Sequence, residues 1–206
     1  METFAPTKST LMAAKSSLEF SEKGFELLDK KRNVLIREMM SYVDKARELQ
    51  DKVNKTFSKA YEALESANIN SGITYIEDIA MTVEEVKDYD IIFKSVMGVE
   101  VPKIIFERKE IEPKYGFNRS NAAIDGAMKE FNNVKYLTYE LAEVENAVYR
   151  LAMEVKKTQK RANALQNIQI PKFEEIVKFV TEVLEEKERE DFFRLKVVKK
   201  KHRKEI

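Results

Sequence analysis

The glycines and prolines of this chain are concentrated in one short segment. Between residues 7 and 66 the only Gly or Pro is Gly24, and between residues 117 and 206 there are only Gly126 and Pro171. The remaining glycines and prolines fall in the first few residues or within residues 67–116. Because both residue types are costly inside helices, the two depleted stretches are expected to be helical. The sequence therefore predicts a mainly α fold: a long antiparallel coiled-coil hairpin with a small α+β insert at its bend.

Apolar residues recur along residues 11–63 at alternating steps of three and four. The sixteen positions of this series include only three polar residues, which are Ser21, Arg32 and Thr56. Such a heptad repeat keeps one apolar stripe against a partner when the two helices supercoil left-handed. A helix over about residues 7–66 would be roughly 90 Å long. The main seam candidates in this half are Leu11, Leu18, Phe25, Leu28, Leu35, Met39, Leu49 and Val53.

The second half of the chain repeats the pattern less evenly. The step from Val134 to Leu137 is a second three-residue step in succession, where a regular heptad would have a four-residue step. Such a break is a stammer, which overwinds a coiled coil locally. Pro171 interrupts the repeat and predicts a kink near Ile170, after which the helix continues. We expect this helix to run from about residue 118 to the late 190s, roughly 120 Å, so that it extends past its partner. Its main seam candidates are Leu141, Val144, Val148, Leu151, Val155 and Leu165.

The insert is expected to mix helix and strand. Apolar residues at helical spacing predict a short helix over about residues 72–86. Residues 90–96 and 99–107 indicate two strands joined at Met97-Gly98, where Gly98 would supply a positive φ, and Pro102 marks its strand as an edge. A lone hairpin is marginally stable, so this one must pack on the helices or on another protein. The residues that we expect on its partner-facing surface are Ile91, Phe93, Val101 and Ile105.

These patterns divide the chain into three predicted segments. Residues 1–66 form the N-terminal coiled-coil helix, residues 67–117 the globular insert, and residues 118–206 the C-terminal helix with a basic tail. Residues 185–191 hold five acids and two bases, whereas residues 194–204 hold seven bases and no acid. The basic stretch is either a frayed, solvated tail or a tip that meets an acidic surface.

Composition argues against several classes of function. The chain has 37 basic and 36 acidic residues, so no global positive field favours nucleic acid. The lack of cysteine excludes disulfides and thiolate metal sites and fits a reducing cytoplasm. No apolar run reaches membrane-spanning length, and the first ten residues lack the apolar core of a signal peptide. We therefore expect a soluble protein with no direct membrane insertion and no nucleic-acid partner.

The residue types that build active sites are not arranged to do so here. The single histidine, His202, lies in the basic tail, which excludes a Glu-x-x-His metal site in a helix bundle. There is no Gly-rich phosphate loop of either common type. Adjacent acids such as Glu84-Glu85 and Glu174-Glu175 do not converge on one helix face. We expect no catalytic residue, no cofactor and no metal ion.

Five sequence blocks together have a recognisable order and spacing. The blocks are Pro6-Thr-Lys-Ser-Thr-Leu11, Gly24-Phe-Glu-Leu-Leu-Asp-Lys-Lys-Arg32, Lys157-Thr-Gln-Lys-Arg-Ala-Asn-Ala-Leu165, Ile170-Pro-Lys-Phe-Glu-Glu175 and Leu184-Glu-Glu-Lys-Glu-Arg-Glu-Asp-Phe-Phe-Arg-Leu-Lys196. They resemble the D subunits of V-type and archaeal-type (A-type) rotary ATPases along nearly the whole chain. Phe25, Asp29, Ala162 and Gln166 depart from residues common in that family, and they affect details of contact only.

The resemblance implies a non-catalytic component of the central stalk, the rotor axle of a rotary ATPase or ATP synthase. It would transmit torque between ATP hydrolysis or synthesis in a catalytic hexamer and proton or sodium transport through a membrane rotor. The implied partners are the catalytic and nucleotide-binding A and B subunits, the F subunit, and an adaptor of the membrane rotor. The implied location is cytoplasmic, peripheral at the membrane through the complex. Candidate contacts to the hexamer are Arg32, Lys160, Arg161, Arg189, Arg194 and Lys196.

Two other classes of protein fit part of the pattern. A prefoldin-like chaperone also pairs coiled helices around β-hairpins, but it would expose apolar residues at both helix tips, whereas the C-terminal tip here is rich in Lys and Arg. A passive coiled-coil scaffold would tolerate the long seam but gives no reason for the insert. Arg32, a charge at a core position, is most simply a device that fixes the register of the two helices.

Overall fold

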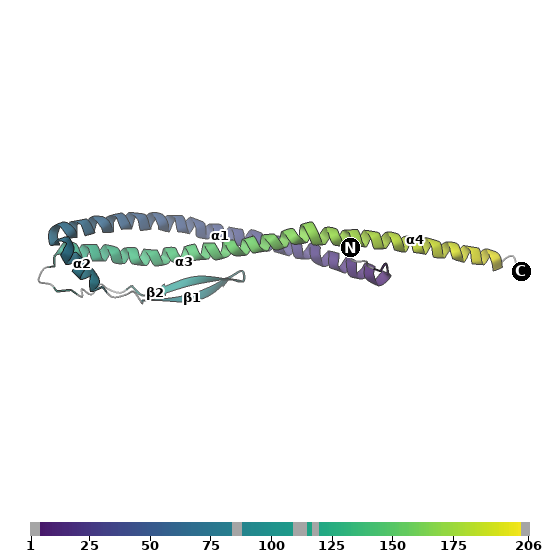
Figure 1. Ribbon diagram of the computed structural model, residues 1–206, viewed down its shortest axis with the longest axis horizontal. Helices are drawn as coiled ribbons and strands as arrows, with labels where there is room; N and C mark the ends of the chain where they lie inside the picture. Colours follow the sequence, from purple (N-terminus) through teal and green to yellow (C-terminus); the bar gives the residue numbers. More distant parts are fainter. Residues whose placement is uncertain (1–4, 84–87, 109–114, 117–119, 203–206) are drawn as a thin grey trace. The chain divides into compact units, whose positions relative to one another are not determined.

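The computed structural model describes residues 5–83, 88–108, 115–116 and 120–202. Two long helical stretches flank a small β-hairpin (Figure 1), which confirms the predicted fold class. The elements in chain order are α1 (Lys8–Ser71), α2 (Ile73–Met81), β1 (Tyr89–Val96), β2 (Val99–Phe106), α3 (Ala122–Ala164), the π-helical turn η1 (Leu165–Gln169) and α4 (Ile170–His202).

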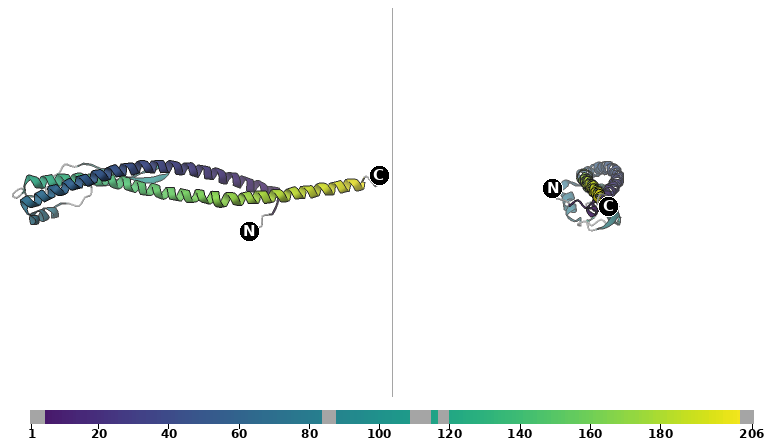
Figure 2. Two further views of the ribbon diagram at one scale, coloured as in Figure 1. Left: turned by 90° about the horizontal axis from the view of Figure 1, so that it is seen from above. Right: turned by 90° about the vertical axis from the view of Figure 1, so that its right-hand side faces the viewer.

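The chain divides into two compact units. The terminal unit consists of residues 1–33 and 156–206, and the insert unit consists of residues 34–155. In each unit, a part of α1 packs antiparallel against a later helical segment. Figures 1 and 2 show this pairing from different directions. The insert unit also contains α2 and the hairpin.

The insert unit has two clusters of buried apolar side chains. In the first, Ala67 near the end of α1 packs with Ile79 of α2 and with Ile124 and Ala127 of α3. In the second, Leu35 of α1 packs with Ala147 and Leu151 of α3 and with Val101 of β2. Each cluster therefore joins the helix pair to one element of the insert, so the insert is held by the same core as the helices.

The ends of the helices follow from capping residues. The helix α1 continues to Ser71, five residues beyond the expected end, because Ala67 extends the buried stripe and Gly72 is the first residue to break the helix. Gly72 has a φ of 84°, which a residue with a side chain rarely adopts. At the start of α3, the Asn121 side-chain oxygen accepts hydrogen bonds from the backbone N–H groups of Ala123 and Ile124 at 3.0 and 3.2 Å.

The short helix is shorter than the sequence indicated. It ends at Met81, where the Thr82 hydroxyl donates a hydrogen bond to the Ile79 carbonyl at 2.7 Å and so closes the last turn. The expected helix continued to about residue 86, and residues 84–87 lie outside the described part of the chain.

The hairpin closes as the sequence predicted. Its two-residue turn has a φ of 52° at Met97 and 80° at Gly98, the pair of positive values that a type I′ turn requires. The strands pair antiparallel with Val96 opposite Val99 and Phe93 opposite Pro102. The prediction named Gly98 as the residue with positive φ, and Met97 shares that conformation in spite of its side chain.

The polar residues of the α1 stripe all have hydrogen-bond partners within their own unit. The Ser21 hydroxyl donates to the Ser17 carbonyl at 2.7 Å, and the Thr56 hydroxyl donates to the Lys52 carbonyl at 2.8 Å. None of the sixteen α1 positions in the stripe is exposed. The stripe is therefore covered along its whole length, and its few polar members do not leave an unpaired group against the partner helix.

In the terminal unit, α1 pairs with η1 and α4. Gly24 lies opposite Leu165, whose Cδ1 atom would be 3.5 Å from a Cβ placed on the glycine. Near the start of α1, the Lys8 ammonium lies 3.2 Å from the Glu188 carboxylate. All described residues from 185 to 201 are exposed, so α4 beyond its ion pair with Lys8 is not covered by another described segment of this unit.

The interruption expected at Pro171 takes the form of a π-helical turn. The Ile170 N–H donates to the Leu165 carbonyl, five residues back, so one extra residue is accommodated just before the proline. Pro171, the next residue, has no N–H to donate, so the ladder of helical hydrogen bonds is interrupted at this position while the backbone continues as α4. The helical path thus continues past the proline, as the sequence predicted.

We predict that Leu35→Ala destabilises the protein far more than Leu27→Ala. Leu35 is 0% exposed in the second cluster, whereas Leu27 is 67% exposed on the same helix. Truncating a buried leucine costs about 2–5 kcal/mol, and an exposed one typically costs within about 0.5 kcal/mol. Thermal melts followed by far-UV circular dichroism test this. Equal melting temperatures for the two variants would show that the buried stripe is assigned incorrectly.

Candidate interaction surfaces

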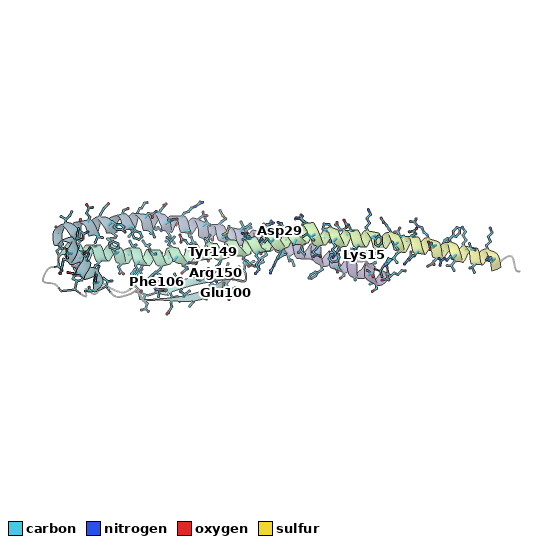
Figure 3. All side chains as sticks on the ribbon, viewed as in Figure 1. Lys15, Asp29, Glu100, Phe106, Tyr149 and Arg150 are labelled. Carbon is cyan, nitrogen blue, oxygen red and sulfur yellow. The ribbon has the colours of Figure 1, made fainter. Side chains whose placement is uncertain are left out.

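The hairpin is attached to α3 through the edge of β2. The backbone N–H of Ile104 donates to the Glu143 carboxylate at 2.8 Å, and the Arg150 guanidinium donates to the Glu100 carbonyl at 3.0 Å. Figure 3 labels Arg150 and Glu100 at this junction. Pro102, between these two positions, has no N–H to satisfy. Side chains of α3 therefore satisfy the polar groups that β2 would otherwise leave unpaired on this side.

Aromatic side chains add a second attachment at the open end of the hairpin. The rings of Phe106 and Tyr136 stack with their centroids 5.3 Å apart, and those of Tyr89 and Tyr139 are tilted at the same separation. Contacts of this kind contribute about 0.5–1.5 kcal/mol beyond the area that they bury. Tyr136 is buried as a result, although it lies outside the predicted seam.

A polar cluster fixes the chain just before β1. The Lys135 ammonium donates to the Asp88 carboxylate at 3.0 Å, and the Tyr139 hydroxyl donates to the other carboxylate oxygen at 3.3 Å. The hydrogen bond from Lys135 is the main cause that lowers the pKa of Asp88. Burial, followed by the nearby Asp88 charge, raises the pKa of Tyr139 to about 12. At neutral pH the cluster is therefore a carboxylate held by one ammonium and one neutral phenol.

The structure divides the four residues expected on the hairpin surface. Ile91, Phe93 and Ile105 are exposed, and the Arg150 guanidinium lies 5.1 Å from the centre of the Phe93 ring. Val101 is only 4% exposed because it packs on the helix pair in the second cluster, so its assignment to the partner surface is wrong. Near the Met97-Gly98 turn, the face of the hairpin that carries Val101 packs on the helices. The alternation of side chains along one strand does not reveal which face of the hairpin is buried.

Sequence reasoning missed the residues of α3 that hold the hairpin. A signal for them is present in the sequence, because they recur at steps of three and four beside the main seam. A helix with two such stripes covers two neighbours, and here the second neighbour is the hairpin. The residues of this second stripe are Tyr136, Tyr139, Glu143, Ala147 and Arg150.

The last part of α4, from residue 189 onward, presents a long exposed stretch in the terminal unit. Phe192 and Phe193 are each 68% exposed and lie between acidic residues 185–191 and the basic residues that begin at Arg194. Leu195, Val197 and Val198 are exposed as well. Exposed apolar side chains beside concentrated charge are characteristic of a surface that another molecule covers.

The six basic residues considered as partner contacts fall into two groups. Arg32 is half-buried, and its guanidinium donates to Gln159 at 2.8 Å and lies 2.5 Å from the Asp29 carboxylate. Its contacts within the terminal unit fit the role of fixing the register. The other five are exposed, and they are Lys160, Arg161, Arg189, Arg194 and Lys196.

Over residues 5–83, 88–108, 115–116 and 120–202, no group of three or more His, Cys, Asp or Glu side chains is placed to hold a metal ion. The described helices also include none with the length and apolar character needed to cross a membrane.

Comparisons with known proteins give one consistent match. The family of ATP synthase D subunits matches residues 10–200 of this chain. The D subunit of the V-type ATP synthase of Thermotoga neapolitana is 45% identical over 197 residues, which cover 96% of this chain and 97% of that protein. The D subunits of the A-type ATP synthases of Thermococcus sibiricus and Pyrococcus furiosus are 39% and 36% identical, and each alignment covers 94% of this chain and 92% of the relative.

We predict that Asp88→Asn weakens the attachment of the hairpin in a pH-dependent manner. Because the folded-state pKa of Asp88 is lowered, its stabilising effect is complete above the ordinary value of 3.8 and is lost as the pH falls through the lowered pKa. Asp88→Asn should therefore be less stable than the wild type at neutral pH, and the difference should shrink in acid. Asp78→Asn, at an exposed carboxylate on α2, is the matched control.

Denaturant unfolding at neutral and acid pH measures this difference. A double-mutant cycle with Lys135→Met separates the ion pair from effects of the single substitutions. A stability difference between the wild type and Asp88→Asn that did not change with pH would contradict the assignment.

Proposed function

Because the chain belongs to the family of ATP synthase D subunits, and is thus a component of a V/A-type ATPase, we propose that it is the axle of the rotor. In this role it transmits torque between ATP hydrolysis or synthesis in a catalytic hexamer and proton or sodium transport in a membrane rotor. The chain itself carries out no chemistry. It acts in the cytoplasm, and it is peripheral at the membrane through the other components of the complex.

The observation that carries this proposal is the end of α4. Torque needs a part of the axle that the hexamer grips, and residues 189–201 are exposed beyond the Lys8–Glu188 ion pair of the terminal unit. Phe192 and Phe193 offer apolar contacts to a surrounding sleeve, and the bases from Arg194 onward offer charged ones. We assign this segment to the catalytic and nucleotide-binding A and B subunits.

The helix pair supplies the mechanical property that an axle needs. Two helices packed along a continuous apolar stripe resist twisting and bending more than a single helix, because deformation would separate buried side chains. Arg32 supports this role by tying α1 to Gln159 within the terminal unit. We propose that the F subunit and the adaptor of the membrane rotor bind elsewhere on the chain. The family match does not support a prefoldin-like chaperone or a passive scaffold.

Reconstitution with the A and B subunits tests the proposal. The purified chain alone should hydrolyse no ATP, whereas adding it to the hexamer of A and B should give a stable complex with an altered rate of ATP hydrolysis. A hexamer whose composition and turnover were unaffected by the added chain would refute the axle role.

Two variants test the part played by the end of α4. A chain that ends at Glu190 should bind the hexamer more weakly than the full chain, and the binding of the full chain should weaken more steeply with salt because exposed charges are screened. The double variant Phe192→Ser/Phe193→Ser should also bind more weakly while its thermal melt stays unchanged, since both rings are exposed in the free chain.

The matched control for these variants is Ile69→Ser, which replaces another exposed apolar residue on α1. It should bind the hexamer like the wild type. If the truncated chain and the full chain had equal affinities at low and at high salt, the end of α4 would be a solvated tail.

A further inference from the structure

The outer edge of β1 is an open hydrogen-bonding edge within the described part of the chain. Ile104 lies opposite Ile91 and directs its N–H to Glu143, so this pair is not hydrogen-bonded across the hairpin. In an antiparallel pair, hydrogen-bonded and non-hydrogen-bonded positions alternate along each strand. At the non-hydrogen-bonded positions, the backbone N–H and C=O groups point away from the neighbouring strand. Ile91 and Phe93 on β1 therefore direct their backbone groups outward, and so do Tyr89 and Ser95.

This edge has two charged residues, Asp90 and Lys94, but none of the other protections usual for edge strands within the described residues. On β2 the corresponding edge is covered by Glu143 and Arg150 and contains Pro102. On β1 every residue from Tyr89 to Ser95 is exposed, and the strand contains no proline or glycine. Natural proteins cover or interrupt a long apolar edge, because it is otherwise a template for another strand. An occupant for this edge is therefore expected.

The sequence of β1 is complementary to itself. When two copies of β1 are aligned antiparallel with Ile92 opposite Ile92 of the second copy, Ile91 faces Phe93, and Asp90 faces Lys94. In this alignment the outward-pointing Ile91 and Phe93 meet as a hydrogen-bonded pair, as the backbone requires. Sliding one strand by two residues in either direction keeps the backbone pairing but separates each Asp90 from Lys94. Sliding in one direction would bring Lys94 opposite Asp88, whose carboxylate is already held by Lys135 and Tyr139, so charge favours the register centred on Ile92.

We propose that the edge of β1 is a self-association surface, on which β1 of a second copy of this chain docks. The product is a four-stranded antiparallel sheet in the order β2–β1–β1–β2, with a two-fold axis at Ile92. The contact is isologous, so it closes after two copies and does not propagate. It involves one strand from each copy and so buries little area, which makes the dimer weak and dependent on concentration. This inference concerns the free chain and does not depend on the axle role.

Cysteine cross-linking tests the register directly, because the chain has no cysteine of its own. In a non-hydrogen-bonded antiparallel pair the Cα atoms lie about 4.5 Å apart, within the range that a disulfide spans. Ile92→Cys should therefore form a disulfide-linked dimer under mild oxidation. The matched control is Ile105→Cys, since Ile92 and Ile105 are 46% and 47% exposed but Ile105 lies on β2, away from the axis. It should cross-link far less.

Charge substitutions test the same register without oxidation. In the Lys94→Asp variant, Asp90 of each copy faces an acid at position 94 of the other copy, so the dimer contains two repulsive pairs. The dissociation constant should rise by roughly tenfold or more. Asp90→Lys should have a similar effect. The combined variant Asp90→Lys/Lys94→Asp restores opposite charges and should recover the wild-type dissociation constant. Sedimentation equilibrium over a range of concentrations measures all four proteins, and their thermal melts show whether each is folded.

Three outcomes would overturn the proposal. One is a full-length chain that stays monomeric at the highest soluble concentration. Another is a dimer that Lys94→Asp does not weaken but truncation after Glu190 abolishes, which would assign association to the end of α4. The third is an Ile92→Cys thiol that is protected from thiol reagents only after the A and B subunits are added. That result would assign the edge of β1 to a different protein.

Discussion

The structure depends on the burial of one continuous apolar stripe along α1. A single long helix in water gains little from its own hydrogen bonds, so its stability comes from the partner that covers this stripe. Because none of the sixteen positions is exposed, every turn of α1 from Leu11 to Ala63 is held. The hairpin and α2 are held by the clusters around Leu35 and Ala67. Removing the stripe would therefore release the insert as well as the helices.

The second stripe of α3 explains how an otherwise marginal hairpin becomes ordered. Glu143 and Arg150 bond to the backbone of β2, and the aromatic rings of Tyr136 and Tyr139 contact Phe106 and Tyr89. The hydrogen bonds from these α3 side chains to the hairpin backbone all go to β2. The same asymmetry that secures β2 leaves β1 with an open edge, so the attachment of the hairpin and its capacity to associate have one physical origin.

The two surfaces without partners differ in chemistry and so suit different contacts. At the end of α4, apolar rings lie among concentrated charges on a single exposed helix, which suits side-chain contacts with a surrounding protein. On β1 the open groups are backbone donors and acceptors, which suit an extended strand. Because these two kinds of surface suit different partners, contacts at one do not compete with contacts at the other.

The sequence by itself determined the helix pair, the seam and the hairpin turn, because heptad spacing and the placement of glycine and proline act locally. It also indicated the family through its five blocks. Tertiary structure decided the rest. The burial of Val101 and Tyr136 depends on how a twisted ribbon lies against α3, and Pro171 is accommodated by a π turn at η1. The open edge of β1 follows from which strand meets α3. These features depend on contacts between residues distant in the chain, and local periodicity carries no information about them.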